Sequence, residues 1–128
     1  MAKGPEEWFK QAEYDMKTAE GLFQSGRYIC VVFMCHLSIE KALKGLYQIK
    51  LSTIPPKVHN LLYFVEAAGI TLPDALYDVV FALNRASIPT RYPENLEQMQ
   101  KDYPKRKTEK LLIQSKEVLK WLKKELKK

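Results

Sequence analysis

Apolar positions recur at helical spacing along this chain and predict helices joined by short turns. The first helix is expected over residues 5–24, because Pro5 suits a first turn and Gly26 suits the left-handed cap that follows a helix. The second is expected from about Tyr28 to about Leu51, where a ThrIleProPro segment ends it. Each of these segments is long enough for a bundle helix.

The second predicted helix is apolar nearly all round. It begins with eight consecutive apolar residues, from Tyr28 to Cys35. Such a run can also be a buried strand, but the helical pattern continues through Leu43 without a turn signal. A helix with apolar residues on most sides has to be enclosed by other elements, so this one is predicted to be central. Cys30 and Cys35 are expected as core residues that point apart and do not bridge each other.

The remaining pattern predicts more helices and no strand. A short helix is expected over His59–Ala68, and a long one from Pro73 to a boundary at Pro89. Residues 89–104 hold three prolines and little apolar period, so a long loop is predicted there. The last long helix is expected after Pro104, running nearly to the end of the chain. The predicted fold is an all-α bundle of four long helices plus one short helix, in a single domain of residues 1–128.

Positive charge is concentrated at the carboxyl-terminal end. Residues 1–100 hold 10 basic and 11 acidic side chains, whereas residues 101–128 hold 11 basic and 4 acidic ones. A basic segment can attract nucleic acid, although a lysine-rich helix face can also serve only to keep the surface solvated. The start of the chain lacks an apolar signal segment, and no apolar run approaches the roughly 20 residues that span a bilayer. A cytoplasmic protein without membrane contact is expected.

Four polar side chains near the central helix are candidates for a site. His36, Glu40 and Lys44 follow one another at intervals of four and therefore share one helix face. They form either a structural polar seam or one wall of a cleft in which His36 or Lys44 faces a phosphate. His59, just after a ProProLys turn, either caps the short helix or titrates in a site.

A second group of candidates consists of basic and aromatic residues around the predicted loop. Arg91 offers a planar fork suited to phosphate, and Tyr92 can stack on a base. Lys105, Arg106 and Lys107 open the last helix, where cations oppose the helix dipole unless an anion binds. The alternative is that these side chains are simply solvated. No metal-ligand spacing, glycine-rich phosphate loop or hydrolase motif is present, so no metal or cofactor is expected.

Together these residues resemble a HEPN domain, a helical family of prokaryotes and higher eukaryotes, along nearly the whole chain. The resemblance is carried by short segments in a fixed order: Ala12, Asp15 and Ala19; Glu40-Lys41-Ala42-Leu43-Lys44; His59-Asn60-Leu61; and Arg91-Tyr92-Pro93. It implies an up-and-down bundle and a homodimer or higher homo-oligomer. It also implies a toxin–antitoxin or defence module in which a minimal nucleotidyltransferase is the partner.

Many HEPN proteins are metal-independent RNases that use an arginine followed, after four to six residues, by a histidine at the dimer cleft. Counting from Arg91, that histidine is replaced by Leu96, Glu97 or Gln98, and Leu37 stands where many members have glutamine. The predicted function is therefore binding of nucleotide or RNA phosphate, or of the nucleotidyltransferase, without catalysis.

Two alternatives remain open. One is an RNase toxin in which His59 or Tyr92 substitutes as the acid or base. The other is a pure dimerisation or interaction module held together by aromatic residues. The aromatic residues expected on or near the edges of apolar stripes are Trp8, Tyr14, Phe33, Tyr63 and Trp121.

Overall fold

The part of the chain described by the computed structural model, residues 3–128, consists of six helices and contains no strand. Four helices are long and two are short, and the prediction of an all-α bundle is confirmed. Met1 and Ala2 lie outside the described residues. They begin the amino-terminal segment in which no apolar signal segment was expected. The helices are α1 (Pro5–Gln24), α2 (Tyr28–Leu51), α3 (Leu61–Ala67), α4 (Asp74–Arg91), α5 (Leu96–Asp102) and α6 (Lys105–Leu126).

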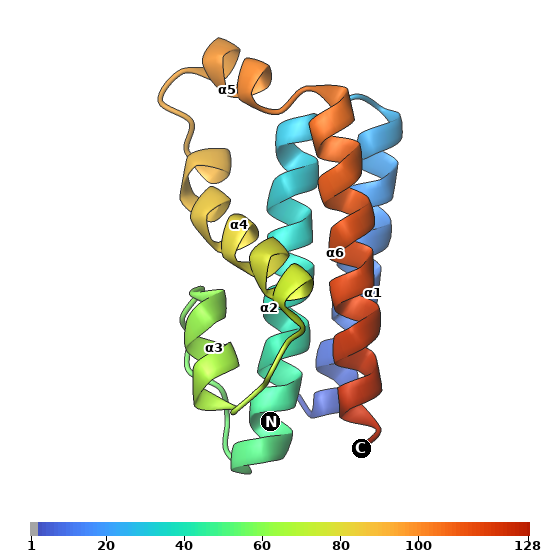
Figure 1. The fold of residues 1–128 in the computed structure, drawn as a ribbon, viewed down its shortest axis with the longest axis vertical. Helices are drawn as coiled ribbons and strands as arrows, with labels where there is room; N and C mark the ends of the chain where they lie inside the picture. Colours follow the sequence, from blue (N-terminus) through green and yellow to red (C-terminus); the bar gives the residue numbers. More distant parts are fainter. Residues whose placement is uncertain (1–2) are drawn as a thin grey trace.

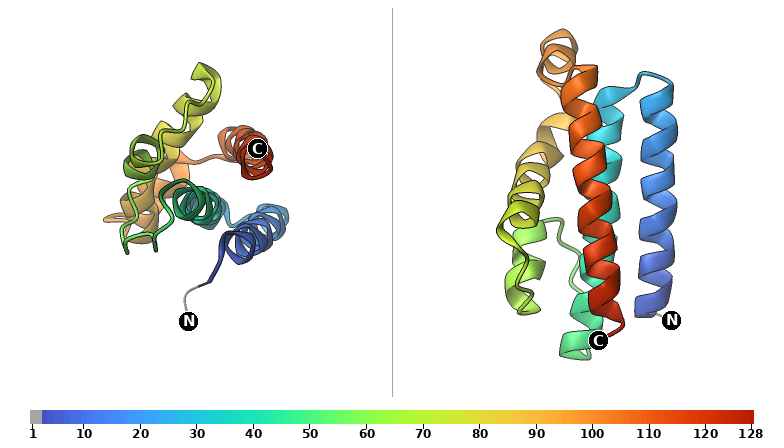
Figure 2. Two further views of the ribbon diagram at one scale, coloured as in Figure 1. Left: turned by 90° about the horizontal axis from the view of Figure 1, so that it is seen from below. Right: turned by 45° about the vertical axis from the view of Figure 1, so that its right-hand side comes forward.

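Helix α2 is the centre of the bundle, as predicted. It packs against α1, α6, α4 and α3, and the views in Figures 1 and 2 show it enclosed between them. Its side chains fill the core because they are apolar around most of the helix. Five of them, all fully buried, are Val31, Cys35, Ile39, Leu43 and Leu46.

Glycine allows α1 to lie close against α2. A Cβ atom at Gly45 would stand 3.0 Å from two ring carbons of Phe9 and 3.2 Å from the carbonyl oxygen of Pro5. The absent side chain therefore leaves room for the first turns of α1. Gly26, in the turn between the same two helices, adopts the predicted left-handed conformation with φ of 78°.

Helix α4 and the segment after it differ from the prediction. Helix α4 continues through Pro89 to Arg91, so the expected boundary at Pro89 is wrong. Pro89 cannot donate to the carbonyl of Arg85, but both residues are exposed, and water can satisfy that carbonyl. The expected loop of residues 89–104 contains α5, which begins where the Asn95 side chain accepts from the Gln98 backbone N–H at 2.9 Å. No residue of α5 is buried, so the apolar period that predicts a helix is missing.

The two cysteines lie in different environments. Cys35 is fully buried, and burial raises the pKa of its thiol to about 12, which suits a core residue. Cys30 is exposed, so the prediction that both cysteines belong to the core is wrong for Cys30. Position 30 lies in the first turn of α2, where the neighbouring helices no longer cover every side. None of the described helices is long and apolar enough to cross a membrane.

Candidate functional site

Glu40 is a buried carboxylate shared by two basic groups. It is 3% exposed, and its Oε2 atom lies 3.0 Å from Nζ of Lys44, one helical turn further along α2. Its two oxygens lie 3.0 and 3.1 Å from Nδ1 of His59, which comes from the segment before α3. Nδ1 of His36 is 3.9 Å from Oε1. The structure thus brings together all four residues that the sequence singled out around the central helix.

His36 is a neutral imidazole at neutral pH. Burial lowers the pKa of His36 to about 4; the Glu40 carboxylate acts in the opposite direction, and the positive charge of Arg91 lowers the pKa further. Its Nε2 lies 3.2 Å from the backbone carbonyl oxygen of His59. A carbonyl can only accept, so Nε2 carries the proton and Nδ1 is left as a buried acceptor without a partner.

His59 connects this cluster to the surface. Its Nδ1–H donates to the Glu40 carboxylate, which fixes the orientation of the ring. The side chain is nevertheless 60% exposed. It lines a groove of about 460 Å³ whose other walls come from the start of α3 and from α4. The other residues that line this groove are Asn60, Asn84, Ser87, Ile88, Arg91 and Tyr92.

Arg91 is the cationic residue of the groove, and it packs against an aromatic ring. The carbon of its guanidinium group lies 4.6 Å from the centre of the Phe33 ring, a cation–π contact between α4 and α2. Its Nε–H is buried and has no hydrogen-bond partner. Within residues 3–128 no carboxylate lies within ion-pair distance of Arg91. The groove therefore has a positive wall, and no acidic side chain of the described residues balances its charge.

The five residues predicted to contact phosphate fall into different places. Arg91 and the exposed Tyr92 line the groove together with His59. Lys107 instead lines a separate cavity between α4 and α6. Lys105 and Arg106 are exposed on the first turn of α6 and line neither space. The structure therefore places the basic start of the last helix away from the groove that contains Arg91.

Three polar residues of the groove, Asn60, Asn84 and Ser87, were not among the site residues predicted from the sequence. The Oδ1 atom of Asn84, on α4, accepts from the backbone N–H of Leu61 at 2.8 Å and so ties the start of α3 to α4. Asn60 caps α3 by accepting from the backbone N–H groups of Leu62 and Tyr63. Asn60 directly before an apolar run is a signal for a helix cap. The sequence contains no signal that Asn84 lies beside this cap, because the two residues are far apart along the chain. In the part of the chain that the structure describes, no cluster of His, Cys, Asp or Glu side chains is suited to a metal ion.

Fold and groove together define a small all-α bundle with a candidate anion site of Arg, His and Asn side chains. Residues 5–126 match the sequence model of the family described as HEPN domain, and the chain belongs to this family. The resemblance expected from the sequence is thereby confirmed.

Two solved structures share the fold. The crystal structure of ST0689, described as an archaeal HEPN homologue, is 26% identical and covers 98% of this chain and 99% of its own, with a TM-score of 0.79. The crystal structure of TT1696 from Thermus thermophilus is 23% identical, covers 94% of this chain and 96% of its own, and has a TM-score of 0.80. A comparison with curated proteins found no match.

Proposed function

We propose that this HEPN protein binds the phosphate of a nucleotide or of RNA in the groove around Arg91. The observation that supports this most directly is the partly buried guanidinium group, which has no acidic partner among residues 3–128. Burying a charge is costly unless it is paired, and the Phe33 ring offsets only part of that cost. A phosphate in the groove would supply the missing negative charge, and its oxygens match the planar donors of arginine.

The other groove residues suit a nucleotide or an RNA chain. His59 has its Nδ1–H bound to Glu40, so its Nε2 is the ring nitrogen free to meet a ligand. Tyr92 is 76% exposed at the edge of the groove, where its ring can stack on an unpaired base. Ser87 and Asn84 add polar groups along α4. Arg91, the proposed phosphate contact, and Tyr92, the proposed stacking surface, therefore line the same groove.

Replacing Arg91 with alanine is expected to weaken binding of a short RNA or a nucleotide by roughly tenfold or more, because hydrogen bonds to charged groups contribute about 1.5–3 kcal/mol. The measurement is a fluorescence titration at two salt concentrations, since phosphate contacts lose strength as salt rises. Arg106→Ala is the matched control, because Arg106 is exposed and outside the groove. No binding by the wild type at either salt concentration, or equal loss in both variants, would contradict the proposal.

The bond between His59 and Glu40 supports a second candidate function, metal-independent cleavage of RNA. A carboxylate that holds one ring nitrogen leaves the other to accept or donate a proton, as a general base or acid requires. Purified protein incubated with RNA and a chelator is then expected to cleave it, and both His59→Gln and Arg91→Ala are expected to abolish cleavage. Equal cleavage by the wild type and Arg91→Ala would indicate a contaminating nuclease.

An exposed apolar stripe on α4 supports self-association. Tyr77, Phe81 and Ile88 are between 40% and 70% exposed and follow one another at intervals of four and seven, which places them on one face of α4. Tyr92, 76% exposed, comes directly after the helix, and its backbone N–H still donates to the carbonyl of Ile88. None of them is among the five aromatic residues predicted at the edges of apolar stripes, of which Tyr14 and Tyr63 are also exposed. Because Ile88 belongs to both the stripe and the groove, a second copy on α4 would place the groove at the subunit junction.

Sedimentation at several protein concentrations is expected to show a dimer that Phe81→Glu converts to monomer, because a charged side chain in place of the apolar ring is costly to bury in the interface. Tyr14→Glu, at an exposed aromatic residue of α1, is the control and is expected to leave the dimer intact. A wild type that stays monomeric at every concentration would contradict both the dimer and the pure interaction module.

A nucleotidyltransferase partner and a place in a toxin–antitoxin or defence module are further proposals that rest on membership of the HEPN family alone. Identification of the neighbouring gene tests them. An adjacent nucleotidyltransferase gene would support the pairing, and a neighbour of unrelated function would count against it.

A further inference from the structure

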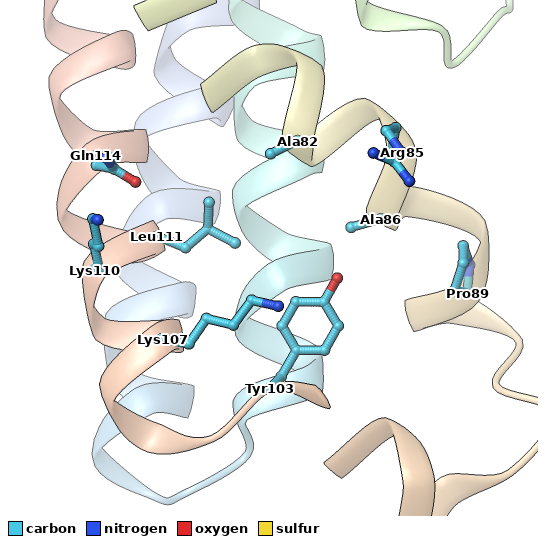
Figure 3. A pocket seen from close by; sticks show the side chains of 9 residues that line it. All are labelled: Ala82, Arg85, Ala86, Pro89, Tyr103, Lys107, Lys110, Leu111 and Gln114. Carbon is cyan, nitrogen blue, oxygen red and sulfur yellow. The ribbon is translucent and has the colours of Figure 1, made fainter. Parts of the chain in front are cut away.

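A second cavity lies between α4 and α6, apart from the groove that contains Arg91. It has a volume of about 530 Å³, within the range of sites for small molecules. Figure 3 shows Arg85 on the α4 side, Lys107 and Lys110 on the α6 side, and Tyr103 between the two helices. Neither Arg85 nor Lys110 was among the site residues predicted from the sequence, and both are exposed.

The charge of this cavity is positive and unbalanced. None of its three cationic side chains forms an ion pair within the described chain, and no acidic residue lines it. The nearby acidic group, Asp102, accepts a hydrogen bond from Nε2 of Gln98 at 3.0 Å. Cations on facing walls repel each other, so a bound anion would stabilise the arrangement.

The remaining walls are neutral and largely apolar. Ala82, Ala86 and Leu111 line the space between the helices, and Lys107 lies over the Tyr103 ring with Nζ 4.7 Å from its centre. Burial of the Tyr103 phenol raises its pKa, and Asp102 acts in the same direction, so the hydroxyl keeps its proton at neutral pH. That hydroxyl points into the space between α4 and α6 and can donate a hydrogen bond (Figure 3).

We propose that this cavity is a binding site for a small organic phosphate, a ligand with two or three negative charges on a flat apolar body. The phosphate groups would lie between Arg85 and the two lysines, and the apolar body would lie against Ala82, Ala86 and the Tyr103 ring. The site shares no residue with the groove around Arg91, so it stands independently of the proposed function.

The test is calorimetric titration of ADP into protein that carries Arg91→Ala. This substitution removes the phosphate contact proposed for the groove, so that any binding measured comes from another site. Saturable binding of ADP is expected. Introducing Arg85→Ala and Lys110→Ala into the same protein is expected to weaken this binding at least tenfold. The control adds Lys120→Ala and Lys124→Ala instead, at exposed lysines of α6 outside the cavity, and is expected to leave binding unchanged. Adenosine, which has the flat body without the charge, is expected to bind at least tenfold more weakly than ADP.

Three results would overturn the proposal: no ADP binding by Arg91→Ala protein, equal binding with and without Arg85 and Lys110, or equal binding of adenosine and ADP. Loss of RNA binding in Arg91→Ala with retained ADP binding would support both sites separately. Circular dichroism confirms that each variant is folded, so that a loss of binding is assigned to the cavity.

Discussion

Replacing Leu43 with alanine is expected to lower the free energy of unfolding by about 2–5 kcal/mol, the usual cost of leaving a cavity where a leucine was buried. Leu43 is fully buried in the middle of α2, the helix that the other long helices enclose. Its removal therefore takes away contacts with several elements together. Urea denaturation followed by circular dichroism measures the change.

The same substitution at the end of the same helix provides the control. Leu51 is the last residue of α2 and is 42% exposed, so Leu51→Ala is expected to change stability by no more than about 0.5 kcal/mol. If Leu43→Ala costs as little as Leu51→Ala, α2 is not the packed centre of the bundle.

Replacing Glu40 with glutamine is expected to cost about 3–5 kcal/mol, because it leaves the Lys44 ammonium group buried without its counter-charge. The shape of the side chain is retained, so the effect reports charge rather than packing. Lys44 is 7% exposed and lies 3.0 Å from the carboxylate, which rules out full solvation of the ammonium group. The amide of glutamine keeps one acceptor oxygen, which Lys44 and His59 would have to share, and it lacks the charge that strengthens the hydrogen bond from His59.

An exposed ion pair provides the control, because it shows what the loss of one negative charge costs where no burial is involved. Glu97 and Lys101 on α5 lie 3.8 Å apart and are largely exposed, so Glu97→Gln is expected to cost less than about 1 kcal/mol. Adding Lys44→Met to Glu40→Gln is expected to restore part of the stability, since no unpaired ammonium group then remains. Equal losses for Glu40→Gln and Glu97→Gln would show that the buried carboxylate is not required.

Local patterns predicted the fold better than the site. The bounds of α2 and its central place follow from a long segment that is apolar on nearly every side. The same reasoning misses α5, whose start is determined by the Asn95 cap and whose residues bury nothing. Pro89 stops a helix in most sequences, but here it falls in the last turn of α4 on an exposed face, where little is lost.

Within the candidate site, helical spacing could predict only the contacts made within one helix. His36, Glu40 and Lys44 are brought together by helical spacing alone. The contact of His59 with Glu40 and that of Arg91 with Phe33 join separate segments, and no periodicity encodes such distances. For the same reason the sequence grouped Lys107 with Arg91, whereas the packing of α6 turns Lys107 toward a different cavity.

Residues 94–102, including all of α5, contribute no buried side chain to the bundle, and α5 projects from one end of it (Figure 1). The rest of the molecule consequently places few demands on the length or composition of this segment. Insertions, deletions and new recognition sequences can accumulate there while the four long helices stay as they are. Over evolutionary time, the segment next to Arg91 is therefore free to diverge faster than the four long helices.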